Sequence, residues 1–72
     1  MSDQPGGKQM AGFLLKKGNY LCELAETHSK AAEYDKAKSL YLQAASWFKK
    51  GGATDKMNEA LQKAKEEEAK KQ

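Results

Sequence analysis

The sequence contains neither valine nor isoleucine, the β-branched apolar residues on which strands most depend. Its apolar residues recur instead at helical spacing. The first such stripe has the pattern i, i+3, i+4, i+7, i+11 and consists of Leu21, Leu24, Ala25, His28 and Ala32. Two later stripes follow the same period: Ala37, Leu40, Tyr41, Ala44 and Phe48, then Met57, Ala60, Leu61 and Ala64. The pattern predicts an all-α chain.

Turn and capping residues divide the chain. Residues 1–9 carry Pro5 and two glycines among polar residues and predict a flexible N-terminal tail. The helical domain is expected over residues 10–65, with Gly51-Gly52 ending the second helix and Thr54 as N-cap of the third. Gly18 leaves open whether residues 10–32 form one helix or two.

The C-terminal residues 66–72 are almost entirely charged or polar. They predict a solvated helical extension, supported by Glu66 with Lys70 and Glu67 with Lys71 at i, i+4. Asp35 suits the first turn of the second helix, because its charge complements the helix dipole.

The composition argues against several classes of function. All 13 basic residues are lysine, and they interleave with 10 acidic residues for a net charge of +3. Without arginine or a purely basic face, the chain is disfavoured as a nucleic-acid binder. No apolar run approaches the roughly 20 residues of a membrane span, and the N-terminus lacks the pattern of a secretory signal. We therefore expect a cytoplasmic protein with no membrane partner.

Catalytic and metal-binding residues are scarce. The chain has one cysteine, Cys22, and one histidine, His28, which lie about 240° apart around a helix. This spacing separates a nucleophile from its base, and Gly6-Gly7-Lys8 lacks the remainder of a phosphate loop. We expect no enzyme activity, no metal and no cofactor.

The segments "LLKKGN" at residues 14–19 and "WFKKGG" at residues 47–52 are offset by 33 residues. The same offset aligns Leu24 with Met57, His28 with Leu61, and Ala31 with Ala64. A period near 33 with paired helices is typical of stacked helical repeats.

The segment from residue 21 to residue 50 resembles the tetratricopeptide repeat (TPR) family through Leu21, Leu24, Ala25, Tyr34, Ala37, Tyr41, Ala44 and Trp47. The resemblance implies an antiparallel helical hairpin followed by a third, capping helix, together a three-helix bundle. His28, Ala32 and Lys49 depart from the family pattern. Residues 32–48 are also similar to the MIT domain, and a plain three-helix bundle accounts for the same stripes.

Both resemblances imply a module that binds a helical or extended segment of another protein. The family's concave face corresponds to Asn19, Cys22, Glu26, Ser29 and Lys30. Cys22 and Glu26 occupy two carboxylate-clamp positions, where Glu26 would repel a C-terminal carboxylate.

A single repeat also leaves apolar edges, at Met10, Phe13 and Leu14 on one side and at Met57 and Leu61 on the other. These edges are expected to meet a partner protein or a second copy of the chain. The sequence thus predicts a protein–protein interaction module or small adaptor. A basic helical protein associated with nucleic acid is the alternative.

Overall fold

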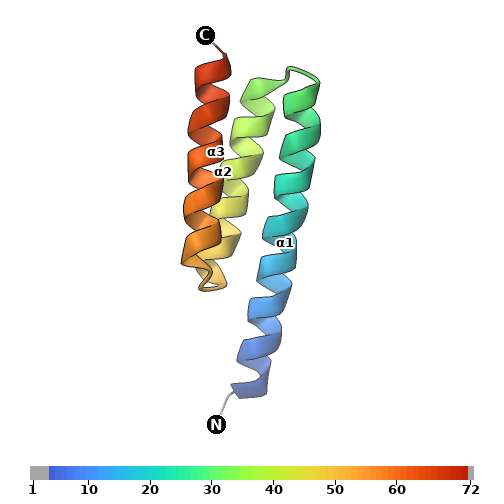
Figure 1. The fold of residues 1–72 in the computed structure, drawn as a ribbon. Coiled ribbons are helices and arrows are strands. Elements are labelled where there is room, and N and C mark those ends of the chain that lie inside the picture. The colour runs from blue at the N-terminus through green and yellow to red at the C-terminus, as the bar shows by residue number, and fades with distance from the viewer. Residues whose placement is uncertain (1–3, 72) are drawn as a thin grey trace.

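The computed structural model describes residues 4–71, with side chains from residue 10 onward. It contains three helices, α1 (Gln4–Lys30), α2 (Tyr34–Lys50) and α3 (Thr54–Lys70), and no strand among the described residues. The helices alternate in direction, and α2 packs against both α1 and α3 (Figure 1). The predicted all-α three-helix bundle is confirmed.

Helix α1 is longer than its neighbours, with 27 residues against 17 in α2 and in α3. At 1.5 Å per residue, α1 is about 40 Å long, whereas α2 and α3 are each about 25 Å long. Its N-terminal part therefore projects beyond the α2–α3 turn (Figure 1). The beginning of the expected tail, residues 1–3, lies outside the described residues, whereas residues 4–9 form the first turns of α1.

Gly18 lies inside α1, so residues 10–30 belong to one helix. The reason for a glycine here is a close approach to α2. A Cβ built on Gly18 would lie 2.5–2.8 Å from three atoms of the Phe48 ring. Phe48 is only 2% exposed and belongs to the main core cluster. Gly18 thus allows the two helices to approach closely enough to bury this ring.

Small residues bring the helices together elsewhere too. Ala25, Ala37 and Ala44 are each 0% exposed, as expected for alanines at a close helix–helix approach. A second core cluster joins Ala25 of α1 and Tyr41 of α2 to a buried alanine of α3, Ala64. The core is consequently thin and made largely of alanine, with Leu21, Tyr41 and Phe48 as its large members.

The two inter-helix turns have the same hydrogen-bonded geometry. After α1, the amide of Glu33 donates to the His28 carbonyl at 2.8 Å, and Ala32 has φ +62°. After α2, the amide of Ala53 donates to the Phe48 carbonyl at 2.9 Å, and Gly52 has φ +77°. Both are Schellman motifs, in which the residue of positive φ is usually glycine. The first turn uses alanine in this strained position.

The 33-residue repeat is wrong as a structural repeat. Gly18 and its two preceding lysines lie in the middle of α1, whereas Gly51 follows the last residue of α2, which runs in the opposite direction. Similarly, Ala31 is exposed in a turn, but Ala64 is buried in α3. The two Lys-Lys-Gly segments are therefore similar in sequence but do not belong to a repeated structural unit.

Two further expectations need correction. Thr54 is the first residue of α3, and the N-cap position belongs to Ala53, which makes no side-chain capping bond. The C-terminal extension is not solvated throughout, because Glu67 is only 3% exposed. The lysines near it pair at i, i+3, Lys70 with Glu67 and Lys71 with Glu68, because Glu67 faces α1.

Candidate interaction surfaces

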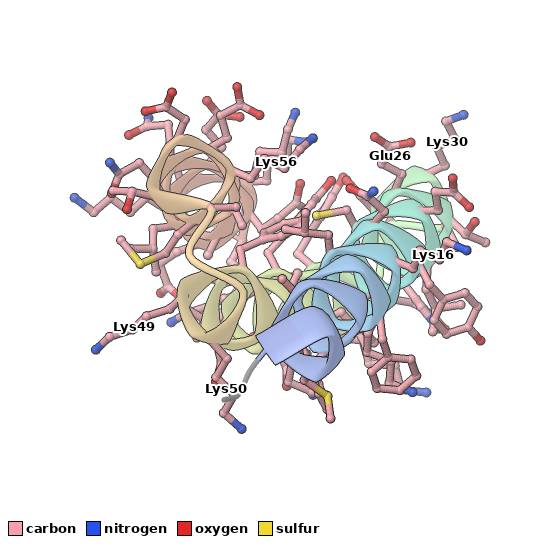
Figure 2. All side chains as sticks on the ribbon, turned by 90° about the horizontal axis from the view of Figure 1, so that it is seen from below. Lys16, Glu26, Lys30, Lys49, Lys50 and Lys56 are labelled. Atoms are coloured by element: carbon pink, nitrogen blue, oxygen red, sulfur yellow. The ribbon has the colours of Figure 1, made fainter. Side chains whose placement is uncertain are left out.

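A hollow of about 240 Å³ lies between α1 and α3, above Tyr41 of α2. Three of the predicted concave-face residues line it: Glu26, Ser29 and Lys30. Figure 2 shows Glu26 and Lys30 on α1, on the same face of the molecule as Lys56 of α3. The remaining lining residues come from α3 and are mostly charged: Lys63, Glu66, Glu67 and Lys70. The hollow therefore carries both signs of charge.

Glu67 ties α3 to α1 across this hollow. Its Oε2 accepts hydrogen bonds from Ser29 Oγ and from Lys70 Nζ, both at 3.0 Å. Lys70 Nζ also donates to Ser29 Oγ at 3.2 Å, closing a three-membered polar network. Glu67 Oε1 is buried without a hydrogen-bond partner. The network links α1 directly to α3, whereas most contacts of these two helices are with α2.

Tyr41 forms the floor of the hollow and is 3% exposed. Burial, together with the negative charges of Glu26 and Glu67, raises the pKa of its phenol to about 12. The phenol therefore stays neutral at physiological pH.

The other two predicted concave-face residues do not line the hollow. Asn19 is exposed on α1, and Cys22 is half-buried against both core clusters. Burial, and then the nearby Glu26 carboxylate, raises the pKa of the Cys22 thiol. A thiol with a raised pKa is a poor nucleophile. His28 contacts Glu33 instead of the cysteine.

A second hollow is an apolar groove between α2 and α3. It consists of two adjoining depressions of about 330 and 470 Å³ that share Leu42 and Leu61. Met57, Ala45 and Ala64 complete the apolar lining. The groove is flanked by three lysines and one carboxylate: Lys38, Lys49, Lys65 and Glu68. Leu42 is 44% exposed and Leu61 is 38% exposed. We call this surface the α2/α3 groove.

The groove contains two of the predicted edge residues, Met57 and Leu61, and adds Leu42, which the sequence analysis missed. Its signal was a second, weaker stripe on α2, in which Lys38, Leu42, Ala45 and Lys49 follow i, i+4, i+7, i+11. This stripe contains only two apolar residues, so the more apolar stripe of Ala37, Leu40, Tyr41, Ala44 and Phe48 dominated the pattern.

Among the remaining edge residues, Phe13 and Leu14 differ in exposure. Phe13 is 57% exposed, whereas Leu14 is half-buried beside the α2–α3 turn. A Cβ built on Gly51 would lie 3.3 Å from the Leu14 Cβ, so the helix and the turn are in close contact here. Phe13 therefore remains available to a partner, and Leu14 is already used within the fold.

Among the described residues, no cluster of three or more histidine, cysteine or carboxylate side chains is arranged to hold a metal ion. Within the same part of the chain, no helix has the length and apolar character needed to cross a bilayer.

No family model, no curated protein and no solved structure matches this chain. The resemblance to tetratricopeptide repeats and to the MIT domain gains no support from these comparisons. What the structure establishes is the coarser result, a three-helix all-α bundle.

Proposed function

We propose that the chain is a protein-interaction module that binds an amphipathic segment of another protein in the α2/α3 groove. The observation that carries this proposal is the apolar floor formed by Leu42, Met57 and Leu61, of which the two leucines remain more than a third exposed. Contiguous apolar surface rimmed by polar residues is a common feature of protein interaction sites.

The shape of the groove favours a helix or an extended strand-like segment as occupant. Two antiparallel helices form parallel walls, and an apolar side chain every three or four residues of a partner helix would follow the floor. Lys49 and Lys65 at the rims favour carboxylates beside the apolar residues of that segment, whereas Lys38 is already paired with Glu68. The proposal assigns the chain no catalytic step, and its cytoplasmic location stays a prediction.

A comparative capture experiment tests the proposal. The full chain, the double variant Leu42→Asp with Leu61→Asp, and the control Gln62→Asp would each be immobilised and exposed to cell extract. Gln62 is exposed on α3, so the control adds a carboxylate to the same helix outside the groove. A protein retained by the wild type and the control, but lost from the double variant, would support groove binding.

The captured protein would then be divided into segments, and the binding segment titrated against the same three chains. We expect at least a tenfold loss of affinity for the groove variant, about 1.4 kcal/mol, since two apolar contacts are lost. Equal affinity for all three chains would contradict the proposal. Sedimentation over about a hundredfold concentration range would show whether a second copy fills the groove instead.

A further inference from the structure

A second apolar surface lies on α1 and α2, away from the groove. Met10, Phe13 and Tyr20 are 58%, 57% and 55% exposed, and their spacing places them along one face of α1. Trp47 of α2 meets Phe13 edge to face, with ring centroids 6.4 Å apart and an interplanar angle of 87°. We call these four residues the aromatic patch.

The aromatic patch and the α2/α3 groove occupy different sides of α2. Trp47 contacts α1 through Phe13, whereas Leu42, Ala45 and Lys49 line the groove against α3. Figure 2 shows the same separation in the charged residues, with Lys49 and Lys50 leaving α2 in different directions. Occupancy of one surface therefore leaves the other accessible.

Lysines lie directly on the patch. Lys17 Nζ lies 5.9 Å from the ring centroids of both Tyr20 and Trp47, and Lys50 Nζ lies 5.1 Å from that of Trp47. Among residues 10–71, neither lysine pairs with a carboxylate, and the described ion pairs all fall within residues 28–38 and 67–71. The cation–π contacts hold these charges over an apolar surface.

The surrounding sequence reinforces this charge. Residues 10–20 and 47–57, which form this end of the molecule, contain five lysines and a single acidic residue, Asp55. The positive potential here is therefore not neutralised locally, and it would attract a negatively charged partner.

We propose that the aromatic patch is a second docking site, which takes an acidic amphipathic helix of another protein. The eleven residues from Met10 to Tyr20 span about 15 Å, the length of roughly three helical turns. Apolar side chains of the partner would cover Phe13 and Trp47, and its carboxylates would pair with Lys17 and Lys50. Tryptophan, tyrosine, phenylalanine and methionine are also the residues enriched in protein interfaces.

A second copy of the chain fits this surface less well. A symmetric pairing through the patch would bring the lysines of one copy against those of the other, and like charges in contact disfavour association. An acidic helix removes that repulsion. Because the groove lies on the opposite side of α2, the chain would bridge two different proteins. Binding of a helix to the patch does not require that the groove is occupied.

Trp47 is the only tryptophan in the chain, so its fluorescence reports on the patch alone. The probe is a designed helical peptide of about 14 residues with leucine along one face and glutamate on both flanks. A second peptide has lysine in place of every glutamate. We expect the acidic peptide to shift the Trp47 emission and to bind at least tenfold more tightly than the basic peptide, with weaker binding as salt rises from about 0.05 to 0.3 M.

Two variants and two controls locate the binding. Phe13→Ser, and separately Lys17→Gln with Lys50→Gln, should each weaken the acidic peptide at least tenfold. The matched control Lys36→Gln with Lys63→Gln, two exposed lysines outside both surfaces, should change affinity less than twofold, and Leu61→Asp should do the same because it alters only the groove. Circular dichroism melts would confirm that each variant is folded. Phe13 and both lysines are exposed, so these substitutions remove no core packing.

Three results would overturn the proposal. Equal binding of the acidic and basic peptides would remove the charge recognition. Loss of acidic-peptide binding in Leu61→Asp would move the site to the groove. Absence of acidic-peptide binding would exclude a helix, and a Trp47 shift with vesicles containing about one-third phosphatidylserine would then assign the patch to anionic lipid instead.

Discussion

The two ends of the molecule are held together differently. At the end formed by the α1–α2 turn and the C-terminus of α3, a hydrogen bond joins His28 of α1 to Glu33 of the turn, and ion pairs join Lys38 to Glu68 and Lys71 to Asp35. The opposite end, formed by the α2–α3 turn and the N-terminal part of α1, carries the lysines and aromatic rings described above. We call them the paired end and the lysine-rich end.

The difference follows from the lengths of the helices. At the paired end, α3 extends far enough to reach α1, and Glu67 contacts Ser29 across the hollow. At the lysine-rich end, α1 projects beyond the α2–α3 turn, so only part of its surface has a neighbour (Figure 1). Charges therefore find partners within the chain at one end and remain available to other molecules at the other. Both proposed docking surfaces include residues from the lysine-rich end.

The largest effect is expected where the lysine-rich end depends on close packing. Gly18→Ala places a Cβ 2.5–2.8 Å from the buried Phe48 ring, so the ring or the helix must shift. We expect a loss of about 1–3 kcal/mol in the free energy of unfolding, measured by urea denaturation.

Gly12→Ala provides the matched control in the same helix. No atom lies within 4 Å of the Cβ it would add, and alanine is the better helix former. This variant should gain about 0.5–1 kcal/mol. A gain of similar size at both glycines would show that α1 and α2 are not in close contact at Gly18.

The next effect concerns the hollow near the paired end. The pKa of Tyr41 is raised from 10.0 to about 12, since burial and nearby carboxylates disfavour the phenolate. Folding therefore keeps the phenol protonated. This contribution to stability is fully present below about pH 10 and is lost as pH rises through about 12.

Tyr41→Phe removes the ionisable group, so this variant should unfold at a higher pH than the wild type in an alkaline titration followed by circular dichroism. Tyr20→Phe, at an exposed position on the lysine-rich end, is the control and should follow the wild type. Identical alkaline midpoints for wild type and Tyr41→Phe would contradict the expectation.

The sequence was sufficient to predict the three helices, because their apolar stripes are local and α2 and α3 end or begin near recognisable glycine and acidic residues. It was also sufficient for the buried alanines of the hairpin. It could not predict that Gly18 serves packing, since this depends on Phe48, which is 30 residues away. Glu67 was likewise missed, because a carboxylate in an acidic run has no local feature that indicates burial against another helix.

The prediction of site residues also succeeded where it depended on local sequence and failed where it depended on distant residues. Glu26, Ser29 and Lys30 share a hollow because one turn of α1 carries them all. Leu14 was grouped with Phe13 as an edge residue but is half-buried, because the exposure of an edge residue depends on where the next turn passes. Here Gly51 passes beside Leu14.

A smaller effect separates the two turns. Ala32 at the paired end and Gly52 at the lysine-rich end have the same positive-φ role. An L-residue with a side chain is disfavoured in this region by roughly 1 kcal/mol relative to glycine. Ala32→Gly should therefore stabilise the protein by about 0.5–1 kcal/mol, and Gly52→Ala should destabilise it by about 1 kcal/mol in thermal melts. The same sign for both substitutions would contradict the shared turn geometry.

The smallest expected effect is the acid sensitivity of the paired end. A hydrogen bond from His28 lowers the pKa of Glu33, and one from Lys38 lowers the pKa of Glu68, both from an ordinary value of 4.5. A lowered carboxyl pKa means that the stabilisation is present above about pH 4.5 and is lost as pH falls through the value in the folded protein.

These side chains are solvent-accessible, so the total change should be small. Its location is the sharper test. Between pH 6 and 3, the protection of the amides against hydrogen exchange, measured relative to the intrinsic rate at each pH, should fall at residues 31–35 before it falls at residues 50–54, because the described ion pairs lie only near the first turn. Glu33→Gln with Glu68→Gln should remove this difference, whereas Glu23→Gln, on an exposed part of α1, should preserve it. A simultaneous fall in protection at both turns of the wild type would mean that the ion pairs do not distinguish the two ends.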